Sequence, residues 1–497
     1  MDTDIQKCFR GKTVFVTGAT GFLGKVVIEK LLRTTEVRRV YLLVRPKRGV
    51  KIDERITTWS REPVFDLLIR ERPEAFQRIC PIAGDCLAPD LGLSEQDRRL
   101  LTTEVQFVIH GAATVRFNEP LHTALAINTR GTRLMLQLAK EMTLLEAFVH
   151  ISTAFSNCVI QDIKEKFYSE LLNCSSQQVL ELSDLVSDEL LDSMEPALLG
   201  SFPNTYTYTK ALAEDVILRE AGGLPLCVFR PAVIIAAHKE PTSGWIDNMY
   251  GPMAILFGVA RGVLRIATID VKAQASLVPV DYCANLALAC AWRTTNVERK
   301  EKEPPSIYQL APSEGNKLTH GEFINHALDG RMRCPLTKML WYPFLHCMTT
   351  LWLYPLAAFF YHTLPAYFFD LALWLQGRKP RLVKIYQKVH STLIILGPFS
   401  CKSWEFATNN TDRLMNQMSA ADRKLFYFDM ASLDWKEYFQ SALGGMRVFL
   451  GKDPLTPESI AKGLKVIKRL KLFHHILQFC LCSVAAAAVW FLLKLVL

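Results

Sequence analysis

A short apolar segment near the amino terminus leads directly into a glycine-rich turn, and this junction constrains the fold more than any other part of the sequence. Residues 13–17, Thr-Val-Phe-Val-Thr, are β-branched or aromatic, as in a buried strand. Residues 18–24, Gly-Ala-Thr-Gly-Phe-Leu-Gly, follow at once, and apolar residues then recur at helical spacing at Val26, Val27, Leu31 and Leu32. Glycines in such a turn let the backbone approach a pyrophosphate, which the amides at the helix N-terminus stabilise. The segment therefore predicts a dinucleotide site between a strand and a helix.

A second predicted strand, residues 39–44, follows about one helix later and ends just before Arg45. Enzymes specific for NAD usually carry Asp or Glu at this place, where the carboxylate binds the ribose hydroxyls. A cation suits a 2′-phosphate instead, so Arg45 favours NADPH as the cofactor. The alternative is that Arg45, Lys47 and Arg48 only form a solvated basic loop.

Two more strands are predicted, over residues 77–83 and residues 105–110. Strands that alternate with helices form a parallel sheet, so we expect an α/β, Rossmann-like doubly wound fold. Ligands bind such sheets at the carboxyl ends of the strands. Asp85 is therefore a candidate for contact with adenine, and the small Ala112 and Ala113 would let the cofactor pass closely. Ordinary loop roles are the alternative for all three.

Candidate catalytic side chains follow the next predicted strand, residues 147–151. Thr153 comes directly after this strand, and Tyr206 and Lys210 lie four residues apart in a helix-favouring segment. That spacing places the phenol and the ammonium on one helix face, where the cation is expected to lower the pKa of the phenol. The Thr153 hydroxyl is placed to bond the same substrate oxygen. Asn128, in a helical Asn-Thr-Arg-Gly-Thr segment, either joins this group or is a buried structural hydrogen bonder.

The carboxyl terminus combines a basic segment with an apolar one. Residues 476–493 form an 18-residue stretch without a charge, which is long enough to span a bilayer. Five cations precede it and only Lys494 follows, a bias that leaves the bulk of the protein in the cytosol. We therefore expect a tail anchor at residues 472–497. The alternative is a hydrophobic terminal helix that packs on its own domain or on a partner.

Charge and cysteine content exclude several other classes. Much of the net charge of +9 lies near the C-terminus, so it does not indicate nucleic-acid binding. The 13 cysteines lack C-x-x-C or Cys/His zinc spacing, so we expect no metal site, and free thiols in a reducing compartment. The amino terminus has no basic start followed by a long apolar run, so we expect no secretory signal.

A long apolar stretch, residues 339–369, contains no Asp, Glu, Lys or Arg but is interrupted by Pro343, Pro355 and Pro365. Three interpretations are open at this point. The stretch is a buried core hairpin, an apolar surface that lies on a membrane or forms the mouth of an acyl-chain tunnel, or a full membrane span.

Several segments, taken together and in order, resemble those of the extended short-chain dehydrogenase/reductases and, in detail, those of the fatty acyl-CoA reductases. They are residues Thr17–Gly24, His110–Phe117, His150–Ala154, Pro203–Glu214, Arg230-Pro231, Gly244–Asn248 and Leu277–Asp281. The likeness runs from about residue 10 to 440. It implies an NADPH-binding reductase domain at 10–325, a smaller helical C-terminal domain of the male-sterility type at 335–450, and the transmembrane tail.

The resemblance also implies an activity and a partner. The family reduces long-chain acyl-CoA to a primary fatty alcohol plus CoA with NADPH, by two hydride transfers through an aldehyde-level intermediate, and serves wax ester or ether lipid synthesis. The membrane is the second expected partner, with the peroxisomal membrane favoured over the endoplasmic reticulum. The sequence does not indicate an oligomeric state.

Site residues are carried over from the family position by position. Thr153 would polarise the carbonyl, Tyr206 would donate the proton, Lys210 would tune it and hold the nicotinamide ribose, and Asn128 would complete a proton relay. Arg230-Pro231 would lie against the nicotinamide. The full set of cofactor residues is Thr17, Gly18, Thr20, Gly21, Phe22, Leu23, Gly24, Arg45, Asp85, Ala112, Ala113, Tyr206, Lys210 and Pro231. Phe155 stands where family members commonly have Tyr.

Two other functions use the same residues. One is an NADP-dependent hydroxysteroid dehydrogenase or another carbonyl reductase of the extended family, because fold alone does not separate substrates. The other is a membrane-tethered scaffold that binds NADPH without turnover. The intact Thr153, Tyr206 and Lys210 argue against the scaffold.

Overall fold

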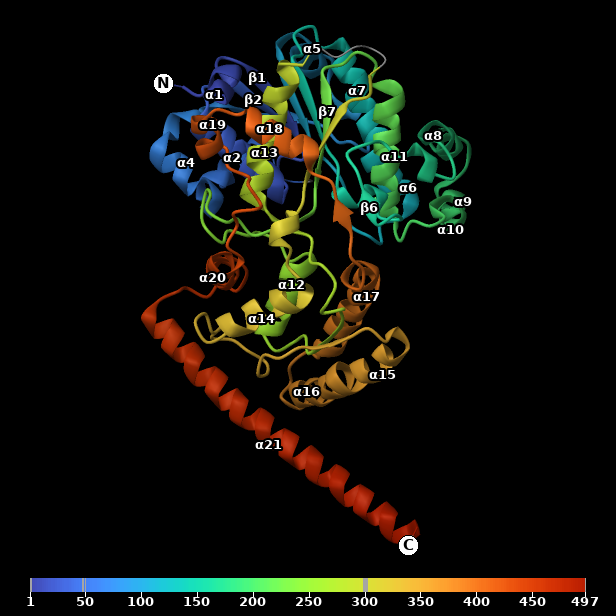
Figure 1. The fold of residues 1–497 in the computed structure, drawn as a ribbon, viewed down its shortest axis with the longest axis vertical. Helices are drawn as coiled ribbons and strands as arrows, with labels where there is room; N and C mark the ends of the chain where they lie inside the picture. The colour runs from blue at the N-terminus through green and yellow to red at the C-terminus, as the bar shows by residue number, and fades with distance from the viewer. Residues whose placement is uncertain (1, 47–48, 50, 298–302, 497) are drawn as a thin grey trace. The chain divides into compact units, whose positions relative to one another are not determined.

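The computed structural model describes residues 2–46, 49, 51–297 and 303–496. Lys47 and Arg48, considered above as part of a basic loop, lie outside the described residues. The central element is a seven-stranded parallel sheet with the strand order β11-β7-β5-β4-β1-β2-β3 (Figure 1). This confirms the expected doubly wound α/β fold. Its strands are β1 (Thr13–Thr17), β2 (Arg39–Val44), β3 (Ile79–Ala83), β4 (Phe107–His110), β5 (Ala147–Ile151), β7 (Leu226–Pro231) and β11 (Ser306–Leu310).

The strand order reverses at β1. From β1 the chain builds outward to β2 and β3 on one side and, after returning, to β4, β5, β7 and β11 on the other. In the register Thr17 lies opposite His110, so the carboxyl ends of β1 and β4 are level. Such a reversal opens a crevice at the strand ends, which is where open α/β sheets bind ligands. The glycine turn after β1 lies at this point.

Helices cover both faces of the sheet. On one face α2 (Phe22–Thr34) packs against α13 (Val280–Thr295), and on the other face α7 (Gly131–Glu141) packs against α11 (Thr205–Glu220) (Figure 1). Almost every residue of α11 up to Ile217 is buried, so this helix is part of the core rather than a surface helix. Tyr206 and Lys210 are thereby held in a rigid element beside β5.

The chain forms two compact units that are interleaved in sequence. The first holds residues up to Trp245, Gln274–Leu318 and Ser403–Leu433, and the second holds Ile246–Ala273, Thr319–Lys402 and Asp434–Leu497. These units divide the chain differently from the continuous ranges 10–325 and 335–450, which stay predictions of where the two family domains lie.

The late segment 403–433 belongs to the first unit through specific contacts. Strand β13 (Glu405–Phe406) pairs in parallel with β6 (Asp162–Ile163), and Trp404 Nε1 donates to the carbonyl of Cys158 at 3.0 Å. The first unit is completed by α1 (Asp4–Phe9), α3 (Ile52–Thr57), α4 (Asp66–Glu71), α5 (Glu95–Glu104), α6 (Leu121–Ala124), α8 (Ser176–Leu185), α9 (Asp188–Ser193), α10 (Glu195–Leu199), α18 (Asn409–Gln417), α19 (Ala420–Leu425), β8 (Val233–Ile235) and β10 (Leu277–Pro279).

The second unit is mainly helical. Its one described strand pair joins β9 (Ile266–Thr268) to β12 (His346–Met348). Its helices are α12 (Gly251–Ala260), α14 (His320–Gly330), α15 (Tyr354–Ala358), α16 (Leu364–Leu375), α17 (Leu382–Ser400), α20 (Trp435–Gly445) and α21 (Pro457–Val496). Among the described residues, Leu351–Leu375 and Pro457–Leu495 are long and apolar enough to cross a membrane, judged by length and composition alone.

The tail helix α21 begins well before the predicted anchor. Its first turns pack on the second unit, where Ile467 and Leu470 are buried. His474 still contacts this unit, because Trp341 Nε1 donates to its Nδ1 at 3.2 Å. From His475 to Leu495 every side chain is exposed. Packing on its own unit is therefore confined to the start of α21.

Candidate active site

The glycine turn after β1 is closed so tightly that side chains are excluded. Gly18 has φ +72°, and a Cβ on it would lie 2.5 Å from the carbonyl oxygen of Gly111. A Cβ on Gly24 would lie 2.3 Å from the carbonyl oxygen of Gly18. Gly21 is the N-cap of α2 without a side-chain hydrogen bond, and the first turn carries no acid, so its amides are left for an anion. This cradle fits the pyrophosphate of a dinucleotide.

Thr17 and His110 tie the ends of β1 and β4 together at the crevice. The Thr17 hydroxyl lies 2.7 Å from His110 Nδ1 and accepts from the amide of Ala112 at 3.2 Å. His110 Nε2 lies 3.2 Å from the hydroxyl of Thr132, and burial lowers the pKa of His110 to about 3, so the ring is neutral. Sequence reasoning did not give His110 a role, although a polar residue at the end of a buried strand was a usable signal.

Arg45 and Asp85 lie side by side at the ends of β2 and β3. Val44 is opposite Ala83 in the register, and Arg45 Nε pairs with Asp85 Oδ2 at 3.0 Å. The Arg45 side chain is 59% exposed, so the guanidinium stays open to solvent. The structure thus brings together two residues that the sequence had placed separately at the adenosine end of the cofactor.

Thr153 and Tyr206 meet at the end of β5, although 52 residues separate them. Tyr206 is partly exposed and stacks on Phe117, with the ring centroids 5.6 Å apart. Burial raises the pKa of Tyr206 to about 12, and a hydrogen bond with the Thr153 hydroxyl opposes this rise. The phenol is therefore protonated at neutral pH.

Lys210 lies one turn further along α11 and is almost completely buried. Its ammonium donates to the carbonyl of Ile151 at 2.8 Å, and burial lowers its pKa to about 8 against the opposing effect of Glu214. Lys210 is not among the causes that shift the pKa of Tyr206. The expectation of a lowered phenol pKa was therefore wrong, because burial raises the pKa of Tyr206 and the cation four residues away does not oppose that rise.

Asn128 lies in η5 (Leu125–Arg130), a turn of π-helix. Its Oδ1 accepts from the amide of Thr114 at 2.9 Å, and its Nδ2 donates to the carbonyl of Thr114 at 3.2 Å and to the hydroxyl of Thr209 at 3.0 Å. These bonds are the structural role that the sequence left open as an alternative. They also place Asn128 against the residue that precedes Lys210.

Arg230 is fully buried and does not turn its guanidinium toward a cofactor. Its Nε donates to Glu214 at 2.9 Å and its Nη2 pairs with the other oxygen of the same carboxylate. The remaining donors bind the carbonyls of Lys164 and Lys166. The expectation that Arg230 lies against the nicotinamide is corrected accordingly: four of its five N–H donors bond Glu214 and the carbonyls of Lys164 and Lys166. Pro231, the last residue of β7, is buried at the strand end.

Glu214 connects this buried pair to the catalytic strand end. Its Oε1 also accepts hydrogen bonds from the hydroxyls of Ser152 and Ser156. These two residues lie on either side of Thr153 in the sequence, so the carboxylate positions the backbone around the Thr153 hydroxyl. The sequence contained Glu214 as part of a helix-favouring run but gave no sign of this role.

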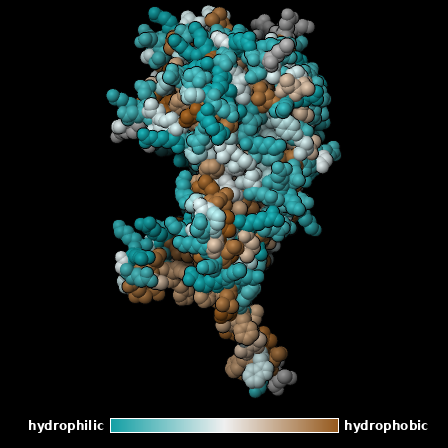
Figure 2. Space-filling model, turned by 90° about the vertical axis from the view of Figure 1, so that its left-hand side faces the viewer, coloured by the Kyte–Doolittle hydropathy of each residue, from teal (hydrophilic) through white to brown (hydrophobic). Residues whose placement is uncertain are grey.

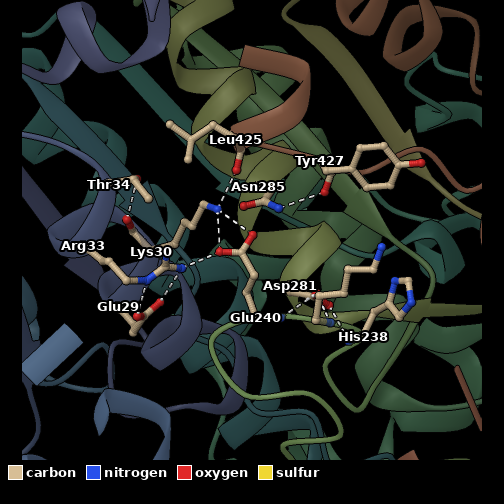
Figure 3. Close-up of polar contacts among 11 residues, drawn as sticks. Glu29, Lys30, Arg33, Thr34, His238, Glu240, Asp281, Asn285, Leu425 and Tyr427 are labelled. Atoms are coloured by element: carbon tan, nitrogen blue, oxygen red, sulfur yellow. Dashed lines mark hydrogen bonds and ion pairs between the residues drawn. The ribbon is translucent and has the colours of Figure 1, made fainter. Parts of the chain in front are cut away.

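A second cluster of charged side chains includes Glu29, Lys30 and Arg33 of α2. Lys30 Nζ bonds both carboxylate oxygens of Glu240, at 2.7 and 2.8 Å, and the carbonyl of Leu425 at 2.6 Å (Figure 3). Arg33 pairs with Glu29 and with Glu240. The cluster therefore fastens the dinucleotide helix to two distant segments of the first unit.

Asp281 holds the segment that carries Glu240. Its carboxylate accepts from the amides of His238, Lys239 and Glu240, at 2.8 to 3.2 Å (Figure 3). The same segment leads to Trp245, which stacks on Phe22 at the start of α2 with the ring centroids 5.2 Å apart. Two motifs that carried the family resemblance thus act on one segment: Asp281 holds its amides, and its Trp245 packs on the helix start that follows the glycine turn.

The sheet topology, the glycine cradle and the Thr153, Tyr206 and Lys210 group together define a nicotinamide-dependent reductase of the extended short-chain dehydrogenase/reductase type. The family models called male sterility protein match the chain in two parts, an NAD-binding domain at residues 16–287 and a second domain at residues 361–453.

Relatives match over nearly the whole chain. The protein named fatty acyl-CoA reductase wat from Drosophila melanogaster is 40% identical over 496 residues, which cover 100% of this chain and 95% of the relative. Fatty acyl-CoA reductase 1 from Homo sapiens is 35% identical, covering 94% and 90%. The chain therefore belongs to the fatty acyl-CoA reductase family and is an oxidoreductase, which confirms the resemblance drawn from the sequence.

Solved structures of reductase domains share the fold. The terminal R domain from the myxalamid PKS-NRPS biosynthetic pathway aligns with a TM-score of 0.58 at 20% identity, covering 88% of this chain and 91% of that domain. The reductase domain of a nonribosomal peptide synthetase from Mycobacterium tuberculosis aligns with a TM-score of 0.56 at 19% identity, covering 91% and 96%. At these identities the likeness concerns the fold alone.

Proposed function

We propose that the protein reduces long-chain acyl-CoA to a primary fatty alcohol and free CoA with NADPH. One acyl-CoA, two NADPH and two protons give one alcohol, one CoA and two NADP⁺. The observation that carries the proposal is the pairing of the Thr153 and Tyr206 hydroxyls at the carboxyl end of β5, beside the crevice at which the glycine cradle lies. The fatty acyl-CoA reductases named above supply the substrate class.

Tyr206, Thr153, Lys210 and Asn128 have separate proposed roles at the substrate carbonyl. The Tyr206 phenol, whose pKa is raised to about 12, is protonated and donates its proton to the carbonyl oxygen as charge develops there. Thr153 donates a hydrogen bond to the same oxygen and fixes its direction. The Lys210 ammonium would hold the nicotinamide ribose beside this group, and Asn128 would complete a proton relay to it.

The same group serves both reductions. In the first, the thioester carbonyl becomes a thiohemiacetal, and its C–S bond then breaks to release CoA as a protonated thiol and leave an aldehyde. In the second, the aldehyde carbonyl occupies the place between Thr153 and Tyr206, and protonation of its oxygen gives the alcohol. NADPH supplies one hydride to the carbonyl carbon in each step.

The proposed cofactor residues lie in the glycine turn and at the neighbouring strand ends. Thr17, Gly18, Thr20, Gly21, Phe22, Leu23 and Gly24 would surround the pyrophosphate, Ala112, Ala113 and Pro231 would line the nicotinamide end, and Tyr206 and Lys210 would hold the ribose. Asp85 would border adenine. Arg45 supports NADPH over NADH, because its exposed guanidinium at the end of β2 is suited to a 2′-phosphate.

The location proposed for the enzyme is a membrane reached by its tail. Residues 472–497 would anchor the chain with the catalytic unit in the cytosol, because the cations precede the apolar stretch. The peroxisomal membrane is favoured over the endoplasmic reticulum, and the alcohol would enter wax ester or ether lipid synthesis. A membrane anchor suits substrates and products that partition into bilayers.

Product identification tests the proposal. Full-length protein in lipid vesicles is offered NADPH or NADH with acyl-CoAs of increasing chain length, and alcohol and aldehyde are resolved by mass spectrometry. Alcohol with NADPH supports the proposal. Bound NADPH without any product from acyl-CoA would move the function to a steroid or small carbonyl, or to a scaffold.

A pair of variants on one helix tests the proton donor. Tyr206→Phe should lower kcat by about 10²- to 10⁴-fold while NADPH still binds. Tyr208→Phe is the matched control, because the Tyr208 hydroxyl is buried without a hydrogen-bond partner in the described structure. Equal rates for the two variants would remove Tyr206 from the proposed role.

A further inference from the structure

The apolar helical segment Tyr354–Leu375 has two different faces. One face is a stripe of buried residues at intervals of four: Tyr354, Ala358, His362, Ala366 and Asp370. This stripe packs against the second unit, where His362 Nε2 accepts from the amide of Arg265 at 2.9 Å and its Nδ1 lies 3.0 Å from His390 Nε2. The stripe, with its polar His362 and Asp370, fixes the segment to its own unit.

The opposite face consists of large apolar side chains that the described structure leaves exposed. We call this set the apolar face: Leu351, Trp352, Leu356, Phe359, Phe360, Tyr367, Phe368, Leu371, Trp374 and Leu375. Trp352 is 78% exposed and Leu375 is 71% exposed. Figure 2 shows brown, hydrophobic atoms along the lower edge of the helical part of the molecule and along the tail helix. An apolar surface of this extent on a folded chain marks an interaction site.

A group of exposed cations follows the apolar face directly. We call this group the basic rim: Arg378, Lys379, Arg381, Lys384 and Lys388. Asp370 is the only acidic residue between positions 341 and 404, and it is buried. Its carboxylate accepts from the amides of Arg381, Leu382 and Val383, at 2.9 to 3.0 Å. The one acid of the region therefore holds the start of α17, and with it the basic rim, at the end of the apolar helix.

The path of the chain excludes a full membrane span for Leu351–Leu375. Residues 403–433 return to the first unit, in which β13 pairs with β6. A single crossing would put these partners on opposite sides of the membrane. Helix α17, the return path, carries Lys384 and Lys388, and the hydroxyl of its Tyr386 donates to the carbonyl of Val263 at 2.8 Å. The segment therefore contacts a membrane from one side.

We propose that the apolar face and the basic rim form a second membrane contact, which enters one leaflet only and prefers anionic phospholipid. Aromatic and leucine side chains would lie at the boundary of headgroups and acyl chains, and the basic rim would contact the phosphate groups. The inference rests on the proposed membrane location but not on the reductase assignment. Its consequence is that the second unit lies against the leaflet in which long acyl chains and fatty alcohols dissolve.

Photocrosslinking to lipid tests this contact. Full-length protein is reconstituted into phosphatidylcholine vesicles with or without about 30 mol% phosphatidylserine, a composition that gives a negative surface. A phospholipid with a photoreactive acyl chain is included, and crosslinked peptides are identified by mass spectrometry. We expect crosslinks in peptides from 351–375 as well as in the tail, and more of them with phosphatidylserine.

Two variants separate the apolar and basic contributions. The triple variant Phe360→Glu, Phe368→Glu, Trp374→Glu should reduce crosslinks at 351–375 by about tenfold or more and leave tail crosslinks unchanged. The control Leu185→Glu changes an exposed leucine of the first unit and should have no effect. In a separate variant, Arg378→Glu, Lys379→Glu and Arg381→Glu should abolish the effect of phosphatidylserine. A helix content by circular dichroism and a thermal unfolding transition equal to those of the unchanged protein show that each variant is folded.

Two outcomes would overturn the proposal. Crosslinks confined to the tail would show that the apolar face does not reach lipid. In a parallel reaction with a bifunctional photoreactive protein crosslinker, crosslinks between two copies of 351–375, together with loss of the lipid crosslinks there, would make this face a dimer interface. Both outcomes are read without turnover, so they are distinct from a failure of the reductase assignment.

Discussion

Replacing Glu214 by glutamine removes one negative charge from beneath the active site while the side chain keeps its size. The Glu214 carboxylate accepts two hydrogen bonds from Arg230, which is fully buried. Breaking a buried ion pair from one side costs about 3–5 kcal/mol, because the remaining charge is left uncompensated away from water. A folded protein has a total stability of only about 5–15 kcal/mol, so this loss is large.

The same substitution also affects Lys210. Burial lowers the pKa of Lys210 to about 8, and the Glu214 carboxylate acts against this effect. Without the carboxylate the pKa of Lys210 falls further, so the ammonium is lost at lower pH. The alkaline limb of the pH profile of kcat should therefore move to lower pH in Glu214→Gln.

Urea unfolding of the full-length protein in detergent, followed by tryptophan fluorescence, measures the stability loss. Glu220→Gln is the matched control on the same helix, because Glu220 pairs with Arg133 where the side chains are 27% and 22% exposed, so solvent screens the charge that is left and the loss should be smaller. A double-mutant cycle with Arg230→Met should give a coupling of about 3 kcal/mol. Equal losses for the two glutamine variants, or a coupling near zero, would refute the buried-pair argument.

Three further results are expected. Arg45→Ala should raise the KM for NADPH about tenfold or more, through loss of a charge-assisted bond, and should leave the KM for NADH unchanged. Arg39→Ala, at the other end of the strand, is the control and should change neither KM. Equal effects of Arg45→Ala on both cofactors would contradict a 2′-phosphate site. Gly24→Ala should weaken NADPH binding about tenfold or more in a titration, because its Cβ would lie 2.3 Å from a backbone carbonyl oxygen, whereas Gly223→Ala has open space and should not change it. Reductase activity should fall as the pH rises through about 8, the value to which burial lowers the pKa of Lys210. Lys210→Arg keeps its charge at this pH, so its activity should not show the alkaline fall. If the fall persists in Lys210→Arg, another group causes it.

Local conformation was largely predictable from the sequence. The strands at 13–17, 39–44 and 147–151 have the predicted bounds, because runs of β-branched and aromatic residues between turns favour the extended backbone of a strand. The strands predicted at 77 and 105 begin two residues later, at Ile79 and Phe107. A 3₁₀ turn (η3, Pro73–Arg78) and the loop after α5 take up the residues that precede them.

The glycine turn was predictable for a related reason. Only glycine tolerates the positive φ of Gly18 and the close approach of Gly24 to its carbonyl oxygen, so the residue types themselves reveal the geometry. The family models and relatives then agreed with the resemblance drawn from this turn and the motifs after it.

Electrostatics was not predictable in the same way. Helical spacing correctly placed Tyr206 and Lys210 on one helix but gave the wrong direction for the pKa of Tyr206, because spacing carries no information on burial. Arg230 was expected at the cofactor, and the structure instead pairs it with Glu214 in the core. Desolvation depends on every segment that surrounds a group, and these segments come from distant parts of the chain.

The sequence by itself determined the α/β fold class and the glycine turn, because each follows from the pattern of near neighbours in the chain. Only the tertiary structure showed which residues of the apolar stretch are covered and which are exposed. It separated a buried stripe from an exposed face, and it returned residues 403–433 to the first unit. Which apolar residues are covered depends on packing between segments far apart in sequence, and a one-dimensional pattern of hydrophobicity does not contain that information.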